Sequence, residues 1–138
     1  SEIERRAYAL GIADNLDLIG EQSNPYKYIS RADVFVLSSI FEGLPNVVIE
    51  AIGCATPVVA TDCPSGPREI LLDGDAGTLV PIRNPELMAH AIFNYLNDSS
   101  LANHHVQAGF DALDRFTPKR AADSYVNLIA ETRHRIGR

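Results

Sequence analysis

Two glutamates, Glu42 and Glu50, are separated by seven residues around a loop and the start of a helix. Glu42 follows an apolar run at 33–39, and Pro45 suits the first position of a helix that reaches about Cys54. A loop carboxylate can accept two directional hydrogen bonds from sugar hydroxyls. A carboxylate about one turn inside the helix can accept from ribose hydroxyls, as acidic residues do in dinucleotide-binding folds. The pair is therefore a candidate for binding a nucleotide-linked sugar.

The N-terminus of the same helix supplies hydrogen-bond donors for an anion. Its first N–H groups have no partner within the helix, and the positive end of the helix dipole lies beside them. These features suit a diphosphate. Structural interpretations stay open: Glu50 can be a solvated helix residue, Glu42 an ordinary loop carboxylate and Gly43 a plain turn glycine. The apolar residues on both sides of Glu50 argue against the first of these.

Alternating strands and helices must position these residues. Strands are predicted at 15–20, 33–39, 57–61 and 77–80, and helices at 3–10, 26–30, 45–54, 68–72, 85–96, 101–116 and from 118 onward. The short spacing indicates βαβ units, and hence an α/β fold with a Rossmann-like parallel sheet, helices on both faces and a helical ending. Ligands bind beyond the carboxyl ends of such strands, so we expect the chemistry in the loops after Ser39, Thr61 and Val80.

Other polar and reactive residues are interpreted as structural. Ser38 and Ser39 suit the capping of a strand end better than a nucleophile, because no loop histidine lies near them. Arg68 is expected in a salt bridge rather than on a phosphate. Cys54 and Cys63 predict buried free thiols. The remaining groups are the histidines of the late helices, expected on the surface or in packing, and an aspartate cluster without calcium-loop spacing: His90, His104, His105, His134, Asp62, Asp73 and Asp75.

Composition excludes several classes of function. The 138 residues suit one domain, and 46% hydrophobic residues permit a core without metal or disulfide staples. A net charge of −6 argues against nucleic acid as a partner, because a phosphate backbone requires clustered Lys and Arg. No stretch reaches the roughly 18 apolar residues needed to span a bilayer, and no signal peptide is visible. We therefore expect a cytoplasmic protein.

The stretch from 33 to 80 resembles the donor-binding half of family 4 retaining glycosyltransferases, which have the GT-B fold. Three motifs carry the resemblance: FEGLPNVVIEA with its glutamate pair, then CATPVVATDCPSGPREIL, then DGDAGTLVP. The similarity extends from about 15 to 117, and the ending RFTPKRAADSYVNLI is similar too. A glutamate pair alone would be a weak signal, but the pair placed between this strand and the TPVVATD segment is specific.

The resemblance implies a role for each residue of the first motif. Glu42 would be a catalytic residue that contacts hydroxyls of the donor sugar, and Glu50 would hold the ribose. Backbone amides near Gly43, Leu44 and Asn46 would face the distal phosphate. Many relatives have Gly-Phe-Gly-Leu after the first glutamate, whereas this chain continues GLPN. Because proline has no N–H group, one potential phosphate donor is lost at this point.

The resemblance also implies an enzyme. The whole protein would transfer a sugar from a nucleotide diphosphosugar to a glycan or a lipid-linked acceptor, with retention of the anomeric configuration. Electrostatic stabilisation of the leaving diphosphate would supply much of the rate. No metal or other cofactor is expected, because no acidic cluster is placed to bridge a metal to the diphosphate. The alternatives are a non-catalytic module that binds a nucleotide sugar or a partner protein, and a nucleotide-sugar epimerase.

Residues 1–138 correspond to part of the nucleotide-sugar-binding domain of that family. The N-terminal acceptor domain, two strands near the middle of the sheet and a basic Arg and Lys pair have no counterpart in this sequence. Upstream of the glutamate pair the basic residues are Arg5, Arg6, Lys27 and Arg31, none in a matching context. We therefore expect the isolated chain to be inactive. The missing strands also predict open sheet edges and self-association.

The segment from Thr117 onward carries five basic residues against two acidic ones. One interpretation is a helix at the inner face of the membrane, a peripheral contact with anionic lipid. The other, which we prefer, is a helix that packs on the domain through Ala122, Tyr125 and Ile129. In the family this helix packs toward the N-terminal domain, so we expect it to be partly unsupported and frayed here.

Overall fold

The computed structural model describes the backbone of residues 1–136 and the side chains of residues 1–133. Its centre is a parallel sheet in the order β1-β2-β3, formed by β1 (Phe35–Leu37), β2 (Val58–Thr61) and β3 (Thr78–Val80). Phe35 lies opposite Val58, and Val59 lies opposite Thr78. The β-branched and aromatic residues of these strands suit a pleated, buried surface. Three of the predicted strands are therefore confirmed, although all three are shorter than predicted, β1 by the most.

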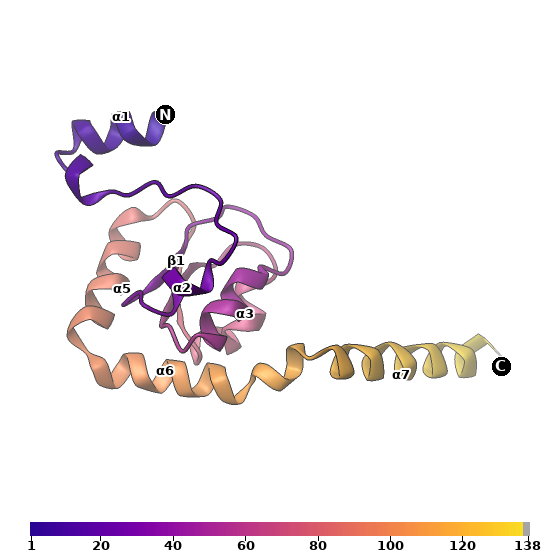
Figure 1. Ribbon diagram of the computed structural model, residues 1–138. Helices are drawn as coiled ribbons and strands as arrows, with labels where there is room; N and C mark the ends of the chain where they lie inside the picture. The colour runs from indigo at the N-terminus through magenta and orange to yellow at the C-terminus, as the bar shows by residue number, and fades with distance from the viewer. Residues whose placement is uncertain (137–138) are drawn as a thin grey trace.

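Helices cover both faces of this sheet (Figure 1). Val58 and Ala60 belong to a core that includes residues of α3 (Asn46–Gly53) and α4 (Pro67–Ile70). Val59 packs instead with residues of α5 (Pro85–Asn97), such as Ala91. Because successive side chains of a strand point to opposite faces, β2 serves two separate cores. This arrangement confirms the predicted Rossmann-like α/β fold.

The remaining elements lie before and after this core. They are α1 (Glu2–Ala9), the 3-10 helix η1 (Ala13–Asn15), α2 (Tyr26–Ile29), the 3-10 helix η2 (Leu72–Gly74), α6 (Ser99–Asp111), the 3-10 helix η3 (Leu113–Phe116) and α7 (Pro118–Ile136). In Figure 1, α6 crosses below the sheet from α5 toward α3. Gly109 permits a close approach there, because a Cβ at that position would lie 3.0 Å from Cγ2 of Ile52. The single helix predicted over 101–116 is wrong, since it ends at Asp111 and η3 follows.

The strand predicted at 15–20 does not form. The segment consists of the end of η1 followed by an extended chain, in which Leu16 and Leu18 are exposed. Figure 1 shows this chain running outside the sheet, between α1 and α2. A strand needs a neighbour for its N–H and C=O groups, and no strand within residues 1–136 lies beside this segment. The alternating sequence therefore has the pattern of a strand without a pairing partner.

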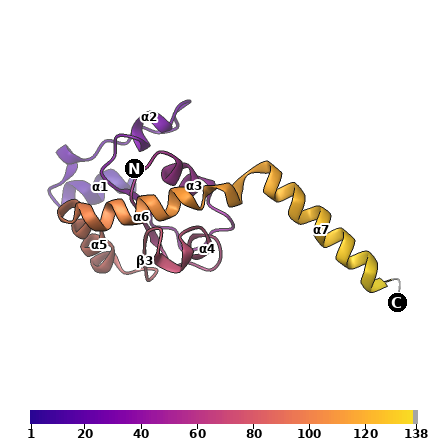
Figure 2. The ribbon, with the colours of Figure 1, turned by 90° about the horizontal axis from the view of Figure 1, so that it is seen from below.

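The preferred packing of the C-terminal helix is also wrong within the described chain. Figures 1 and 2 show α7 projecting away from the sheet, with Tyr125 69% and Ile129 58% exposed. Thr117 has an extended backbone (ψ 147°) before Pro118, which separates α7 from η3. The alternative of a helix on a membrane surface stays a prediction. Among residues 1–136, no helix combines the length and apolar character that a membrane crossing requires.

Tyr95 of α5 joins the helices to the sheet through its buried hydroxyl group. Thr78 of β3 donates to this hydroxyl at 3.1 Å, and Nδ1 of His105 lies 2.6 Å from it. The hydroxyl also lies 3.3 Å from the carbonyl oxygen of Val58. Burial raises the pKa of Tyr95, while burial and the neighbouring His104 lower the pKa of His105. Both shifts favour the neutral forms of the two side chains. A neutral imidazole can accept a hydrogen bond from the Tyr95 hydroxyl at Nδ1.

We expect Tyr95→Phe to lower the free energy of unfolding by about 1–3 kcal/mol, because it removes hydrogen bonds from buried polar partners. Urea unfolding followed by circular dichroism measures this change. Tyr125→Phe is the matched control, since the Tyr125 side chain is exposed on α7. Removal of its hydroxyl group should lower the free energy of unfolding by at most about 0.5 kcal/mol. Equal unfolding midpoints for Tyr95→Phe and the wild-type chain would show that this network does not stabilise the fold.

Candidate functional site

Glu42 lies beyond the carboxyl end of β1, where its carboxylate is held by a neighbouring hydroxyl. The hydroxyl of Ser39 donates to Oε1 of Glu42 at 2.6 Å. Ser39 is held in turn by Thr61 of β2, whose hydroxyl lies 2.5 Å from the Ser39 carbonyl oxygen. Glu42 itself is half-buried. The arrangement fixes one carboxylate oxygen and leaves the rest of the group able to accept hydrogen bonds.

Helix α3 begins directly after this loop, at Asn46. Pro45 precedes the first helical residue, with φ −72° and ψ 92°, so its predicted place as the first helical residue is wrong by one position. No side chain of the described residues caps the helix, although the N–H group of Val48 donates to the carbonyl oxygen of Pro45 at 2.9 Å. The N–H groups at Asn46 and Val47 are therefore the ones left for another acceptor. Leu44 and Gly43 are exposed beside them. The uncapped end can therefore bind an anion.

Glu50 lies on α3, four residues after Asn46, and a spacing of four places both residues on one side of the helix. Its side chain is half-buried. Among residues 1–133, no hydrogen bond or ion pair engages its carboxylate. Because no buried side-chain oxygen among the described residues lacks a partner, the Glu50 carboxylate reaches solvent and is free to accept hydrogen bonds from a ligand.

A second loop, between β2 and α4, packs against the Glu42 loop. The hydroxyl of Ser65 donates to the backbone carbonyl oxygen of Glu42 at 2.8 Å. Gly66 has φ +79°, and a Cβ there would lie 2.3 Å from the carbonyl oxygen of Gly43. Neither Ser65 nor Gly66 is among the site residues expected from the sequence. The available signal was the PSGP turn at the carboxyl end of a buried strand.

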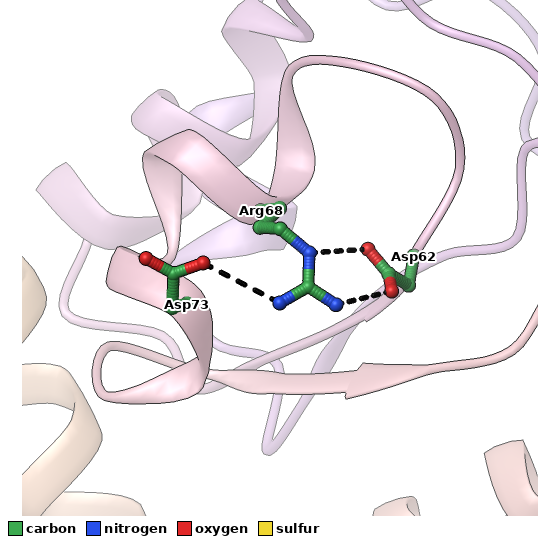
Figure 3. A network of polar contacts seen from close by, with 3 residues as sticks. All are labelled: Asp62, Arg68 and Asp73. Atoms are coloured by element: carbon green, nitrogen blue, oxygen red, sulfur yellow. Dashed lines mark hydrogen bonds and ion pairs between the residues drawn. The ribbon is translucent and has the colours of Figure 1, made fainter.

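Arg68 of α4 forms an ion-pair network rather than a free anion site (Figure 3). Its Nε donates to Oδ1 of Asp62 at 3.0 Å, and its Nη2 pairs with Oδ2 of the same residue. Its Nη1 lies 3.4 Å from Oδ1 of Asp73. Asp62, and then Asp73, raise the pKa of Arg68. The predicted salt bridge is confirmed, and the guanidinium is already committed to two carboxylates.

The other reactive residues lie apart from the glutamates. Cys54 and Cys63 are both free thiols, as predicted. The predicted burial is confirmed for Cys63 and is wrong for Cys54, which is only partly buried. Of the histidines, His90 and His104 are exposed and His105 belongs to the Tyr95 network; the side chain of His134 lies outside the described residues. Within residues 1–133, no group of three or more His, Cys, Asp or Glu side chains could hold a metal ion.

Curated relatives include bacterial glycosyltransferases. The chain is 38% identical over 92 residues to the N-acetylgalactosamine-N,N'-diacetylbacillosaminyl-diphospho-undecaprenol 4-alpha-N-acetylgalactosaminyltransferase of Campylobacter jejuni, covering 67% of this chain and 25% of that protein. It is 33% identical over 129 residues to the lipopolysaccharide core biosynthesis glycosyltransferase LpsE of Rhizobium meliloti, covering 93% of this chain and 38% of that protein. The chain thus spans well under half the length of either relative.

A solved structure shares the fold. A variant of TarM from S. aureus, in complex with fondaparinux, alpha-GlcNAc-glycerol and UDP, superposes with a TM-score of 0.83 at 25% identity. The match covers 92% of this chain and 26% of that chain. Residues 1–111, most of the chain, match the family described as Glycosyl transferases group 1. The chain therefore belongs to the group 1 glycosyltransferase family.

Proposed function

We propose that the whole protein transfers a sugar from a nucleotide diphosphosugar to a glycan or a lipid-linked acceptor, and that this chain binds the donor. One observation carries the proposal: Glu42, fixed by Ser39, lies beside the uncapped N-terminus of α3, with the unpaired Glu50 one turn further along. The relatives support it, since the Campylobacter jejuni protein is named for a transfer onto a diphospho-undecaprenol acceptor.

Each part of the site takes a part of the donor. The first N–H groups of α3 receive the diphosphate, and the helix dipole stabilises the negative charge that grows as the diphosphate leaves. Glu50 accepts hydrogen bonds from the ribose hydroxyls, and Glu42 accepts from hydroxyls of the sugar. The backbone amides near Gly43 and Leu44 complete the phosphate site.

We further propose that the transferred sugar is a hexose and that its anomeric configuration is retained. The bond between the anomeric carbon and the phosphate oxygen breaks, the acceptor oxygen bonds to the same face of that carbon, and the acceptor proton leaves with the diphosphate. The motif resemblance supports retention. Product stereochemistry from proton NMR coupling constants decides it, since an inverted anomeric centre would rule out the retaining mechanism.

The proposed transfer needs no divalent metal. The amides at the start of α3, together with basic residues of the whole protein, would balance the diphosphate charge instead. The carboxylates of Asp62 and Asp73 support this, because each forms an ion pair with Arg68 and is therefore less available to a metal. Transfer by the whole protein in the presence of EDTA tests the proposal, and activity abolished by EDTA and restored by Mg²⁺ would overturn it.

We expect the isolated chain to show no sugar transfer, whereas the whole protein transfers sugar from at least one common nucleotide sugar. The chain spans 25% and 38% of the two relatives named above, so most of the acceptor-binding surface of such proteins lies outside it. Incubation of each protein with radiolabelled nucleotide sugars and a lipid-linked acceptor, followed by chromatography, measures transfer. Product from the purified chain alone would contradict the expectation.

We also expect the isolated chain to self-associate through β1. This strand lies at the edge of the sheet within residues 1–136, and Val36 on it is 38% exposed. The apparent mass from light scattering should rise with concentration, and Val36→Lys should reduce the rise because a charged edge resists pairing. A clean monomer at high concentration would contradict the open-edge interpretation.

A further inference from the structure

The Glu42 loop is held by a second loop, between β2 and α4, to which the proposed function assigns no part of the donor. We infer that Ser65 and Gly66, in the loop between β2 and α4, are positioning residues that set the geometry of Glu42. This inference rests on the proposed function, because Glu42 matters for transfer only if it contacts the donor. Ser65 acts through a hydrogen bond, and Gly66 acts through a close approach that only glycine permits.

Ser65 fixes the backbone at Glu42 while Ser39 fixes its side chain. The Ser65 hydroxyl lies 2.8 Å from the Glu42 carbonyl oxygen, across 22 intervening residues, and 2.7 Å from the carbonyl oxygen of its neighbour Pro64. Its single proton is therefore shared between these two acceptors. The Ser39 hydroxyl donates to the Glu42 carboxylate at 2.6 Å. Ser65 also has φ +62°, a left-handed conformation that a non-glycine residue keeps only when its surroundings impose it. Glu42 is thus held at two points, its carboxylate and its backbone carbonyl group.

Gly66 lets the two loops meet. Its φ of +79° suits glycine, and a Cβ there would lie 2.3 Å from the Gly43 carbonyl oxygen and 2.6 Å from Cδ of Pro45. Both neighbours belong to the segment that joins Glu42 to α3, and neither is the flexible end of a side chain. A methyl group at position 66 must therefore displace the start of α3 or the Gly43 peptide.

The loop that carries Ser65 and Gly66 is itself anchored. The N–H group of Asp62 donates to the carbonyl oxygen of Val80 at 2.7 Å, which ties the start of the loop to β3. The Asp62 carboxylate pairs with Arg68 at the other end of the loop (Figure 3). Arg115 donates to the carbonyl oxygens of Glu69 and Ile70, at 3.3 and 3.2 Å. The sheet and η3 therefore hold this loop in place, and the loop can in turn fix the position of Glu42.

The control for backbone strain is Gly74. It also has a positive φ, +110°, but nothing lies within 4 Å of a Cβ placed there. Gly74→Ala therefore introduces an alanine at positive φ without touching the Glu42 loop. Comparison of Gly66→Ala with Gly74→Ala separates displacement of the loop from a general loss of stability.

The first measurement needs no ligand: hydrogen exchange of the amides at 40–47 in the whole protein. We expect faster exchange there in Gly66→Ala and Ser65→Ala, and wild-type exchange in Gly74→Ala. The second is kcat/KM for whichever of UDP-N-acetylglucosamine, UDP-N-acetylgalactosamine, UDP-glucose and GDP-mannose the wild type uses. We expect roughly a 3- to 10-fold loss in Ser65→Ala and more than about 10-fold in Gly66→Ala. The binding of the free nucleoside diphosphate should change less than that of its sugar conjugate in Ser65→Ala.

The outcomes separate the two proposals. Faster exchange at 40–47 in Gly66→Ala and Ser65→Ala, together with a wild type that uses no nucleotide sugar, would support the contact between the loops and rule out the proposed function. Exchange at 40–47 equal to that of Gly74→Ala in both variants would overturn the positioning role. So would kcat/KM values within about twofold of the Gly74→Ala control, or equal losses for the free diphosphate and the sugar conjugate in Ser65→Ala.

Discussion

In the whole protein, we expect Glu42→Ala to lower kcat/KM for the nucleotide sugar by roughly 100- to 10,000-fold, because it removes two charge-assisted hydrogen bonds of about 1.5–3 kcal/mol each. Glu42→Gln should fall between this variant and the wild type, since the amide keeps one acceptor. Steady-state kinetics with the preferred nucleotide sugar measure both. Ser39 keeps the position of the side chain in the glutamine variant, because its hydroxyl can donate to the amide oxygen as it does to Oε1.

The control for Glu42 is Glu21→Ala, which removes an exposed loop carboxylate from another part of the chain. It should leave kcat/KM within about twofold of the wild type. If Glu42→Ala folds normally and retains wild-type kcat/KM, Glu42 is an ordinary loop carboxylate and the catalytic role is wrong. A loss confined to thermal stability would point to the same conclusion.

Glu50→Ala should raise the donor KM by roughly 10- to 100-fold with a smaller change in kcat, because a ribose contact is present in both the ground state and the transition state. The unpaired carboxylate on α3 motivates this expectation. Isothermal titration calorimetry with the nucleoside diphosphate should show the same loss of binding affinity in the absence of turnover. The effect should be nearly as large for the diphosphate as for the full donor, which distinguishes Glu50 from Glu42.

Glu86→Ala provides the matched control for Glu50, since Glu86 is an exposed carboxylate in the first turn of α5. Its donor affinity should equal that of the wild type. Unchanged KM and kcat in a well-folded Glu50→Ala variant would leave Glu50 as a solvated helix residue. In that case the ribose would need another acceptor.

The sequence predicts the layered fold because its strong signals are local. The apolar runs at β1 and β2 and the proline at the start of α5 each specify an element through nearby residues. Two of the failed predictions concern elements that depend on neighbours not found among residues 1–136. The segment at 15–20 has the alternation of a strand but no pairing partner among residues 1–136, and α7 has an apolar stripe but no surface to cover.

The residues of the site also differ in how far the sequence predicts them. Glu42 and Glu50 are recognisable because seven residues and one helix start separate them. The roles of Ser65 and Gly66 depend on a contact between two loops that lie far apart in the sequence, which no periodicity reports. The ordinary turn signal PSGP predicts a bend, but not what that bend touches.

The most direct test of the donor-site assignment is a crystal structure of the whole protein with whichever of UDP, GDP and ADP binds most tightly. We predict the diphosphate at the first N–H groups of α3, and a ribose hydroxyl about 2.7–3.2 Å from the Glu50 carboxylate. A nucleotide whose phosphates contact other residues, such as Arg68, while Glu50 faces only solvent would contradict the assignment.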